Sequence, residues 1–316
     1  MTSPSADDPM TDAVPAPTAI GARTFVWGSR TFVMGILNIT PDSFSGDGLI
    51  RSAGVARAAG NPPLDPVAAA IDRARRMVEE GADLLDVGGE STRPGHATVD
   101  AAEEIGRVIP VVAAIREALP EMPISIDTTK VAVAEAALAA GASLLNDIWG
   151  TGADVGMAEL AARSGVPLIV MHNREVATYR DVVGEVVDDL SRALERAEVV
   201  GVEAGNLIVD PGIGFGKTAD HNVTVLRHLD ALRALGRPIL LGTSRKSTIG
   251  RILDLPADQR LEGTLATTAL GIRAGADIVR VHDVQPNVRA ARVSDAIVRG
   301  TWRAEPDPPR PEGGPS

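Results

Sequence analysis

Two chemically distinct sets of polar residues recur along this chain of 316 residues. Asp127, Asn146 and Asp210 form an acceptor-rich set. A carboxylate accepts two parallel N–H bonds from an amidine-like edge, which is the edge that a guanine or pterin ring presents. The second set is cationic and suits a diphosphate or a carboxylate. Its members are Arg93, Arg245, Lys246, Arg280 and His282. Together the two sets predict one pocket, with a nitrogen heterocycle at its floor and anionic groups at its rim.

The segments that carry these residues repeat one pattern. Residues 81–86 read Gly-Ala-Asp-Leu-Leu-Asp, and similar copies begin at Gly141 and Gly275. Each copy has a glycine that ends a helix, then a short apolar strand, then a polar residue. Short apolar strands that alternate with amphipathic helices are typical of a buried parallel sheet. Eight such strands are predicted, over residues 32–36, 83–87, 123–126, 143–145, 167–170, 207–209, 238–241 and 277–281.

Eight alternating units predict an α/β fold, a single-domain (β/α)8 TIM barrel, with an open doubly wound sheet as the structural alternative. Asp65 before Pro66, and Asp100 before Glu103, predict where two of the helices begin. A short hairpin of residues 25–30 with 31–34 is expected to close the barrel floor. The barrel is expected to span residues 23–303, between Pro-rich tails (1–22 and 304–316) whose composition predicts disorder.

The carboxyl ends of barrel strands are where such folds carry their chemistry. A hydrogen-bonding or charged group follows every predicted strand. One such group is usually a helix cap, but eight that meet at one barrel mouth are costly to bury unless a ligand or a network satisfies them. His172, after the fifth strand, fits a buried core histidine as well as it fits a ligand.

The composition narrows the class of protein. A net charge of −11 and an aromatic content of 3% argue against a nucleic-acid binder. The absence of cysteine excludes disulfides, thiolate nucleophiles and Cys-ligated metals. No apolar run approaches the roughly 20 residues of a membrane helix, and residues 1–22 resemble neither a secretory signal nor a transit peptide. We therefore expect a cytoplasmic protein that binds neither nucleic acid nor membranes.

Several segments, in chain order and each at a predicted strand end, resemble dihydropteroate synthase, the pterin-binding enzyme family of bacterial folate synthesis. The likeness spans residues 33–299, and its motifs are residues 34–45, 86–95, 125–128, 146–147, 171–172, 210–217, 242–247 and 280–283. The resemblance implies a TIM barrel that joins the diphosphate ester of 6-hydroxymethyl-7,8-dihydropterin to 4-aminobenzoate. The products would be 7,8-dihydropteroate and diphosphate. It also implies a Mg²⁺ cofactor, a homodimer built through late helices, and a sulfonamide target.

The resemblance assigns a role to residues at each matching position. The pterin ring would contact Asp127, Asn146, Met171, Asp210, Lys246 and Arg280. The diphosphate would contact Asn38, Thr92, Arg280 and His282, with Asn38 also the protein ligand of Mg²⁺. The 4-aminobenzoate pocket would consist of Phe44, Thr92, Arg93, Pro94, Phe215, Ser244 and Lys246. The residues expected to carry catalysis are Asp210, Lys246, Arg280 and His282.

One motif departs from the family pattern. The family commonly reads Ser-Phe-Ser-Asp-Gly-Gly after the first strand, whereas residues 43–48 read Ser-Phe-Ser-Gly-Asp-Gly. Asp47 therefore does not match the loop aspartate of the family and receives no assigned role, and neither do Arg245 and His172. Phe44 and Phe215, which are two of only four phenylalanines, fall in loops at the predicted mouth and are expected to contact 4-aminobenzoate.

Two other functions remain as alternatives. A methyltetrahydrofolate-binding methyltransferase barrel would share the pterin-binding carboxylates, but a methyl carrier has no diphosphate for Lys246, Arg280 and His282 to stabilise. A catalytically inactive pterin-binding paralogue would not need Asn38 or Thr92 to be intact. The chemistry needs no covalent nucleophile, because diphosphate is a good leaving group once a metal and cations neutralise it. The protein would then act by positioning, charge neutralisation and exclusion of water.

Overall fold

Eight parallel strands form the wall of a barrel in the computed structural model, which describes residues 14–39, 65–90, 99–150, 152 and 154–301. Their hydrogen-bonded order is β8-β7-β6-β5-β4-β3-β10-β9. The sheet closes where the N–H of Val209 donates to the carbonyl of Pro238 at 3.0 Å. The predicted (β/α)8 barrel is therefore confirmed. The strands are β3 (Phe32–Asn38), β4 (Leu84–Gly88), β5 (Ile124–Asp127), β6 (Leu144–Asp147), β7 (Leu168–Met171), β8 (Leu207–Asp210), β9 (Leu240–Leu241) and β10 (Ile278–Val281).

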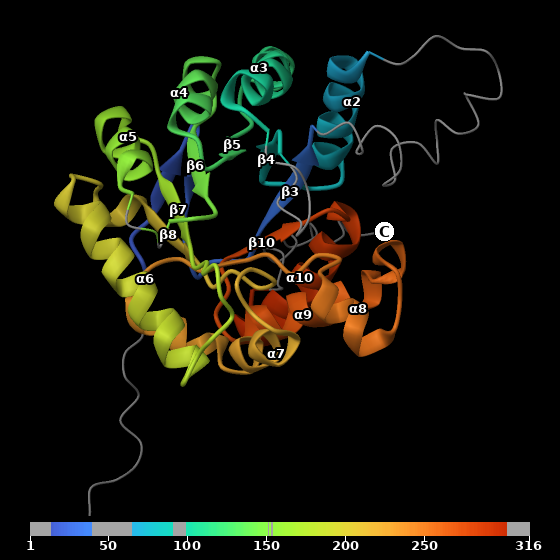
Figure 1. Ribbon diagram of the computed structural model, residues 1–316. Helices are drawn as coiled ribbons and strands as arrows, with labels where there is room; N and C mark the ends of the chain where they lie inside the picture. Colours follow the sequence, from blue (N-terminus) through green and yellow to red (C-terminus); the bar gives the residue numbers. More distant parts are fainter. Residues whose placement is uncertain (1–13, 40–64, 91–98, 151, 153, 302–316) are drawn as a thin grey trace, which may run out of the picture.

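Helices surround the strands (Figure 1). They are α2 (Pro66–Glu79), α3 (Ala101–Ala118), α4 (Val131–Ala139), α5 (Gly156–Ser164), α6 (Val182–Val199), α7 (Ala219–Arg227), α8 (Ser247–Leu253), α9 (Leu261–Arg273) and α10 (Val284–Val298), with short 3-10 turns η2 (Ala204–Asn206), η3 (Leu229–Leu235) and η4 (Ala257–Gln259). Two predicted helix starts are confirmed: the Asp65 carboxylate accepts the N–H of Val67, and that of Asp100 accepts the N–H of Glu103. These bonds satisfy amides that the first turn of a helix leaves unpaired.

The hydrophobic residues form two cores, one on each side of the barrel wall. The larger core packs the outward-facing strand residues against the surrounding helices. The smaller core fills the lower half of the barrel interior, with one residue from nearly every strand. Its strand residues are Met34, Leu84, Leu144, Ile169, Ile208, Leu240 and Ile278. Alternate residues of a strand face the same side. The next inward residue along several of these strands is polar, so a polar layer lies directly on the apolar one.

The barrel floor is closed by an N-terminal hairpin, as expected, but from different residues. Strand β1 (Thr18–Ile20) pairs antiparallel with β2 (Arg23–Phe25), whereas we predicted residues 25–30 paired with 31–34. The hairpin turns at Gly21, whose φ of 59° suits a residue without a side chain. That prediction was wrong because it assigned the Thr18–Ile20 alternation of buried and exposed residues to a disordered tail. Residues 18–22 belong to the fold, while residues 1–13 and 302–316 lie outside the described part.

Aromatic rings seal this floor. Phe25 lies 4.7 Å from Phe32 and 5.7 Å from Trp27, measured between ring centroids. The indole N–H of Trp27 donates to Thr18 Oγ1 at 3.0 Å, and this hydroxyl donates in turn to the carbonyl of Gly205 at 2.6 Å. The buried polar atoms of Trp27 and Thr18 in this floor are thereby paired, which keeps the cost of burying them low. Within the described residues, no helix is long and apolar enough to cross a membrane.

We predict that Phe25→Ala lowers the free energy of unfolding by about 3–5 kcal/mol, because it empties a well-packed site that no neighbour can refill. Urea denaturation followed by circular dichroism measures this change. Val26→Ala, one residue away but 50% exposed, is the matched control and should change stability by less than about 0.5 kcal/mol. Equal decreases in the free energy of unfolding for both variants would show that the aromatic packing around Phe25 has no special role.

Candidate active site

A buried ion triad occupies the polar layer of the barrel. Arg280 on β10 donates from Nε to Asp86 Oδ2 at 2.5 Å and from Nη2 to Asp127 Oδ2 at 2.6 Å. Asn146 Nδ2 donates to the same Asp86 oxygen at 3.2 Å. These residues come from four strands. On β4, β6 and β10 the polar residue follows the inward-facing apolar residue by two positions. The triad therefore connects strands across the barrel interior rather than along the wall.

The triad leaves acceptor capacity unused. Asp86 Oδ1 and Asp127 Oδ1 are buried and have no hydrogen-bond partner among the residues that the structure describes. Burial raises the pKa of Asp127 to about 7, and the nearby Asp86 carboxylate adds to the rise that Arg280 opposes. Burial alone would lower the pKa of Arg280, but the two carboxylates outweigh it and raise that pKa. A buried oxygen without a partner favours a ligand that donates N–H groups.

Asp210, at the end of β8, is the second buried carboxylate of the predicted floor. Its Oδ1 accepts the N–H of Gly212 at 2.7 Å, so its other oxygen is the one available to a ligand. Burial raises the pKa of Asp210, and the Gly212 N–H opposes this rise. Met171, the last residue of β7, pairs in register with Asp210, and its side chain is buried.

Lys246 lies between the buried carboxylate of Asp210 and Phe215, which belongs to the loop after β8. Its ammonium lies 3.9 Å from the centroid of the Phe215 ring, within the range of a cation–π contact. Burial lowers the pKa of Lys246 to about 8, and the carboxylate of Asp210 is the main group that opposes this shift. The backbone at Gly214 passes so close that a Cβ there would lie 2.9 Å from Lys246 Cδ. This packing fixes the lysine between an aromatic wall and the buried carboxylates.

Ser244 and His282 form a second polar group at the mouth. Ser244 Oγ accepts the backbone N–H of His282 at 3.1 Å and lies 3.0 Å from His282 Nδ1. Arg73 on α2 donates to the carbonyl of His282 at 2.7 Å. The loops after β9 and β10 are thus held together beside Lys246 and Arg280, the arrangement expected for residues that bind one anionic ligand.

Arg245, which received no assigned role, supports the site from outside. It pairs with Asp283 through two hydrogen bonds, of 3.0 Å from Nε and 2.7 Å from Nη2. Its φ of 57° lies in the left-handed region, which costs a non-glycine residue of order 1–3 kcal/mol. The carbonyl of Arg245 accepts a hydrogen bond from Arg260, and the backbone N–H of Arg245 donates to the Thr264 hydroxyl. Arg245 therefore holds the turn that aims Ser244 and Lys246 into the barrel.

His172 is a core histidine, the other unassigned case. It is fully buried, with Nδ1 2.7 Å from Lys217 Nζ and Nε2 3.1 Å from Asp189 Oδ2. An ammonium only donates, so Nδ1 accepts and the ring proton lies on Nε2. Burial lowers the pKa of His172 to about 4, with the Lys217 cation adding to this effect. The imidazole is neutral and committed to these two partners.

A third support lies where β4 and β5 end. Lys130 Nζ bonds Glu90 at 2.5 Å and the fully buried Glu104 at 2.7 Å. Glu90 also accepts the N–H of Val99 at 3.1 Å, so the residues on either side of 91–98 are connected. Neither Lys130 nor Asp86 was predicted from the sequence to belong to the site. A charged residue inside an otherwise apolar parallel strand, as in Leu-Leu-Asp-Val, is the signal that could have revealed Asp86.

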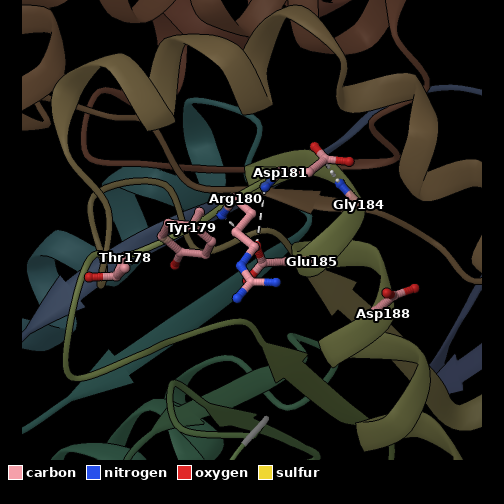
Figure 2. A pocket seen from close by; sticks show the side chains of 7 residues that line it. All are labelled: Thr178, Tyr179, Arg180, Asp181, Gly184, Glu185 and Asp188. Carbon is pink, nitrogen blue, oxygen red and sulfur yellow. Dashed lines mark hydrogen bonds between the residues drawn. The ribbon is translucent and has the colours of Figure 1, made fainter.

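A hollow lies beside the start of α6, and Figure 2 shows the side chains that line it. Its volume is about 560 Å³. Its lining residues are Thr178, Tyr179, Arg180, Asp181, Gly184, Glu185 and Asp188. Two carboxylates there are used locally: Glu185 Oε1 accepts the N–H of Arg180 at 2.7 Å, and Asp181 Oδ1 accepts that of Gly184 at 3.2 Å. These bonds cap the start of the helix, and none of the buried oxygens without a partner among the described residues lies in this hollow.

Most of the predicted site residues thus meet at the barrel mouth. The structure brings together Asp127, Asn146, Met171, Asp210, Phe215, Ser244, Lys246, Arg280 and His282, and places Asn38 at the end of β3 on the same side. Five predicted residues lie outside the described residues: Phe44, Asp47, Thr92, Arg93 and Pro94.

Comparison with known proteins agrees with this geometry. The family model described as pterin binding enzyme matches residues 34–282. The chain belongs to the pterin-binding enzyme family. A dihydropteroate synthase of Clostridium beijerinckii is 48% identical over 281 residues, which cover 89% of this chain and 99% of that relative. The predicted resemblance to dihydropteroate synthase is therefore confirmed.

Two solved structures show the same likeness in three dimensions. A dihydropteroate synthase from Clostridium difficile, crystallised in the presence of pteroic acid, is 47% identical with a TM-score of 0.79 and covers 87% of this chain and 99% of its own. A dihydropteroate synthase from Xanthomonas albilineans, solved with 4-aminobenzoic acid, is 39% identical with a TM-score of 0.81, and the coverage is 90% and 98%. Members of this pterin-binding family thus share the whole barrel with this chain.

We predict that Arg245→Ala is less stable than Arg245→Gly by about 1 kcal/mol, although both lose the ion pair with Asp283. Glycine adopts the left-handed conformation without a steric cost, whereas alanine does not. Urea denaturation of both variants isolates the backbone contribution. A more stable alanine variant would mean that the turn at residue 245 relaxes once the ion pair is gone.

Proposed function

We propose that this chain is a dihydropteroate synthase, which condenses (7,8-dihydropterin-6-yl)methyl diphosphate with 4-aminobenzoate. The carbon–oxygen bond to the diphosphate breaks, a carbon–nitrogen bond forms, and the amine nitrogen loses a proton. The observation that carries this proposal is the set of buried acceptors, Asp127 Oδ1 and the second oxygen of Asp210, in a pocket that also holds Arg280 and Lys246. Membership of the pterin-binding family supports it.

The acceptors suit the polar edge of the pterin. Asp127 Oδ2 accepts a bond from Arg280, which leaves Oδ1 for the ligand. Asp210 Oδ1 accepts the N–H of Gly212, which leaves Oδ2 for the ligand. The N–H groups of the pterin would satisfy these oxygens, which are costly to leave unpaired. The guanidinium of Arg280, held by two carboxylates, would cover the ring and meet the diphosphate. The carbon framework would thereby be fixed before any bond breaks.

The substitution itself needs charge stabilisation more than a nucleophile. The electron-rich dihydropterin can stabilise a methylene cation once diphosphate leaves, and an arylamine is a fair nucleophile toward that cation. Arg280 and His282 would bind the diphosphate as its charge grows. Lys246, stacked on Phe215, would form one wall of the 4-aminobenzoate pocket together with Ser244. We propose that sulfonamides, as analogues of 4-aminobenzoate, would occupy the same wall.

A Mg²⁺ ion is part of this proposal. Asn38 ends β3 on the mouth side and provides a hard amide oxygen, the type of donor that Mg²⁺ prefers. Among the described residues, no group of three or more His, Asp or Glu side chains could hold a metal. An ion at Asn38 would therefore take most of its oxygens from the diphosphate and water, as Mg²⁺ commonly does. When bound, it would neutralise charge on the leaving group.

The proposal is tested by mixing the purified chain with the pterin diphosphate, 4-aminobenzoate and Mg²⁺. We expect release of diphosphate and formation of 7,8-dihydropteroate, both of which fall when Mg²⁺ is omitted. A chain that binds the pterin but forms no product would be an inactive pterin-binding paralogue. Methyl transfer from methyltetrahydrofolate without diphosphate release would instead identify a methyltransferase.

We predict that Asp210→Asn weakens pterin binding by about tenfold to a hundredfold. One oxygen would still accept the Gly212 N–H, but the new amide would point a donor at the donors of the ring. Isothermal titration with a pterin measures the effect, and Asp188→Asn, on the exposed face of α6, is the control with unchanged affinity. Unchanged affinity in Asp210→Asn would remove this carboxylate from the pterin floor.

We further propose that the chain acts in the cytoplasm as a homodimer through α9 and α10. These helices pack side by side and expose Leu270, Val293 and Ile297, which are 66%, 62% and 76% accessible. Apolar side chains gathered on one face are typical of an interface.

Light scattering after gel filtration should give twice the 32.8-kDa chain mass. We predict that Ile297→Glu shifts this mass to that of the monomer, because the interface would bury an unpaired charge. Val199→Glu, at an 86% exposed position on α6, should remain dimeric. A monomeric wild-type chain would contradict the proposed interface.

A further inference from the structure

Lysine is rare in this chain, and its few positions are not random. Only three of the 31 basic residues are lysines: Lys130, Lys217 and Lys246. Each follows a strand, respectively β5, β8 and β9, and so lies at the carboxyl end of the barrel. Arginine carries the positive charge everywhere else. A lysine ammonium is compact and has three diverging donors, whereas a guanidinium is planar, so the two cations suit different sites.

Lys130 binds two carboxylates and Lys246 belongs to the proposed site, whereas Lys217 bonds the backbone of the loop that carries Phe215. Its ammonium contacts His172 Nδ1 at 2.7 Å, the carbonyl of Gly212 at 3.1 Å, the carbonyl of Phe215 at 3.2 Å and, at the longer distance of 3.5 Å, the carbonyl of His172. The three shorter contacts suit the three N–H bonds of an ammonium. Burial lowers the pKa of Lys217 to about 7, and the Asp210 carboxylate is the main group that opposes this.

The two carbonyls belong to the loop between β8 and α7. Gly212, at one end, donates its N–H to Asp210 in the pterin floor. Phe215, three residues on, places its ring under the Lys246 ammonium. At Gly212 the loop backbone lies so close to the end of β7 that an added Cβ would be 1.9 Å from the carbonyl oxygen of His172. Lys217 therefore connects the shape of this loop to a rigid base in β7 and α6, through His172 and Asp189.

We propose that Lys217 is a positioning residue, whose ammonium sets the loop after β8 so that Phe215 forms the wall of the 4-aminobenzoate pocket against Lys246. This inference rests on the proposed function. It assigns Lys217 no contact with either substrate. Asp127, Asn146 and Asp210 lie on strands, and the Gly212 N–H connects the loop to only one of them, so the loss of Lys217 should affect the 4-aminobenzoate pocket more than the pterin floor.

Steady-state kinetics of Lys217→Met, which keeps an unbranched side chain one atom shorter and removes its donors, tests the proposal. We expect the KM for 4-aminobenzoate to rise about tenfold to a hundredfold, because small displacements of a positioned group have effects of this size. The dissociation constant of the pterin, measured by calorimetry, should change by less than about threefold. An unchanged KM, or equal losses for both substrates, would overturn the proposal.

Tyr179→Phe is the matched comparison. The Tyr179 hydroxyl donates to the carbonyl of Gly216 at 2.8 Å, so this variant removes one neutral hydrogen bond from the same loop and leaves the ammonium in place. Its KM for 4-aminobenzoate should rise less than about threefold. An effect as large as that of Lys217→Met would mean that the loop needs general packing rather than the ammonium, and would also overturn the proposal.

A spectroscopic measurement keeps this test separate from the proposed function. In the wild-type chain, ¹⁵N NMR should show His172 neutral with its proton on Nε2, because Lys217 donates to Nδ1. In Lys217→Met, the pKa of His172 should rise from about 4, because the cation that adds to its lowering is gone. An unchanged His172 signal would refute the contact between Lys217 and His172. If the wild-type chain makes no dihydropteroate, the proposed function fails. The NMR measurement would still show whether Lys217 donates to His172.

Discussion

The ion triad of Arg280, Asp86 and Asp127 is the interaction on which the rest of the site depends. Three charges taken out of water are tolerable only when each finds its partners, and removal of one typically costs about 3–5 kcal/mol because a buried charge is left uncompensated. The triad spans the barrel interior from β10 to β4 and β5. The barrel wall therefore holds the charges at their spacing, and the charges in turn hold the strands.

This arrangement requires a firm base. The apolar layer of one residue from nearly every strand, sealed by Phe25, Trp27 and Phe32, excludes water from beneath the polar layer. A dry base strengthens every electrostatic interaction above it and raises the pKa of buried carboxylates such as Asp127. The mouth, in contrast, is shaped by loops that side chains hold in place, including Arg245 with Asp283 and Lys217 with His172.

The period of the sequence made the barrel predictable. Glycine, a short apolar strand and a polar residue recur, and each observed strand begins within two residues of its predicted start. Residues at strand ends, such as Asp127 and Asp210, were predictable for the same reason. The hairpin was misplaced because three-residue strands have little periodicity. The contacts of Arg245 with Asp283, Lys130 with Glu90 and Lys217 with His172 escaped prediction because these partners are distant in sequence, and no local pattern records such pairs.

The scarcity of lysine has a practical consequence for protein chemistry. Reagents that acylate side-chain amines find only three targets on this chain, and all three surround the barrel mouth. The arginines that cover the remaining surface do not react with them. Apart from the label on the α-amine, every mass increment from such a reagent therefore comes from the carboxyl end of the barrel. A lysine-specific protease would likewise cut this chain only at the rim of its own pocket.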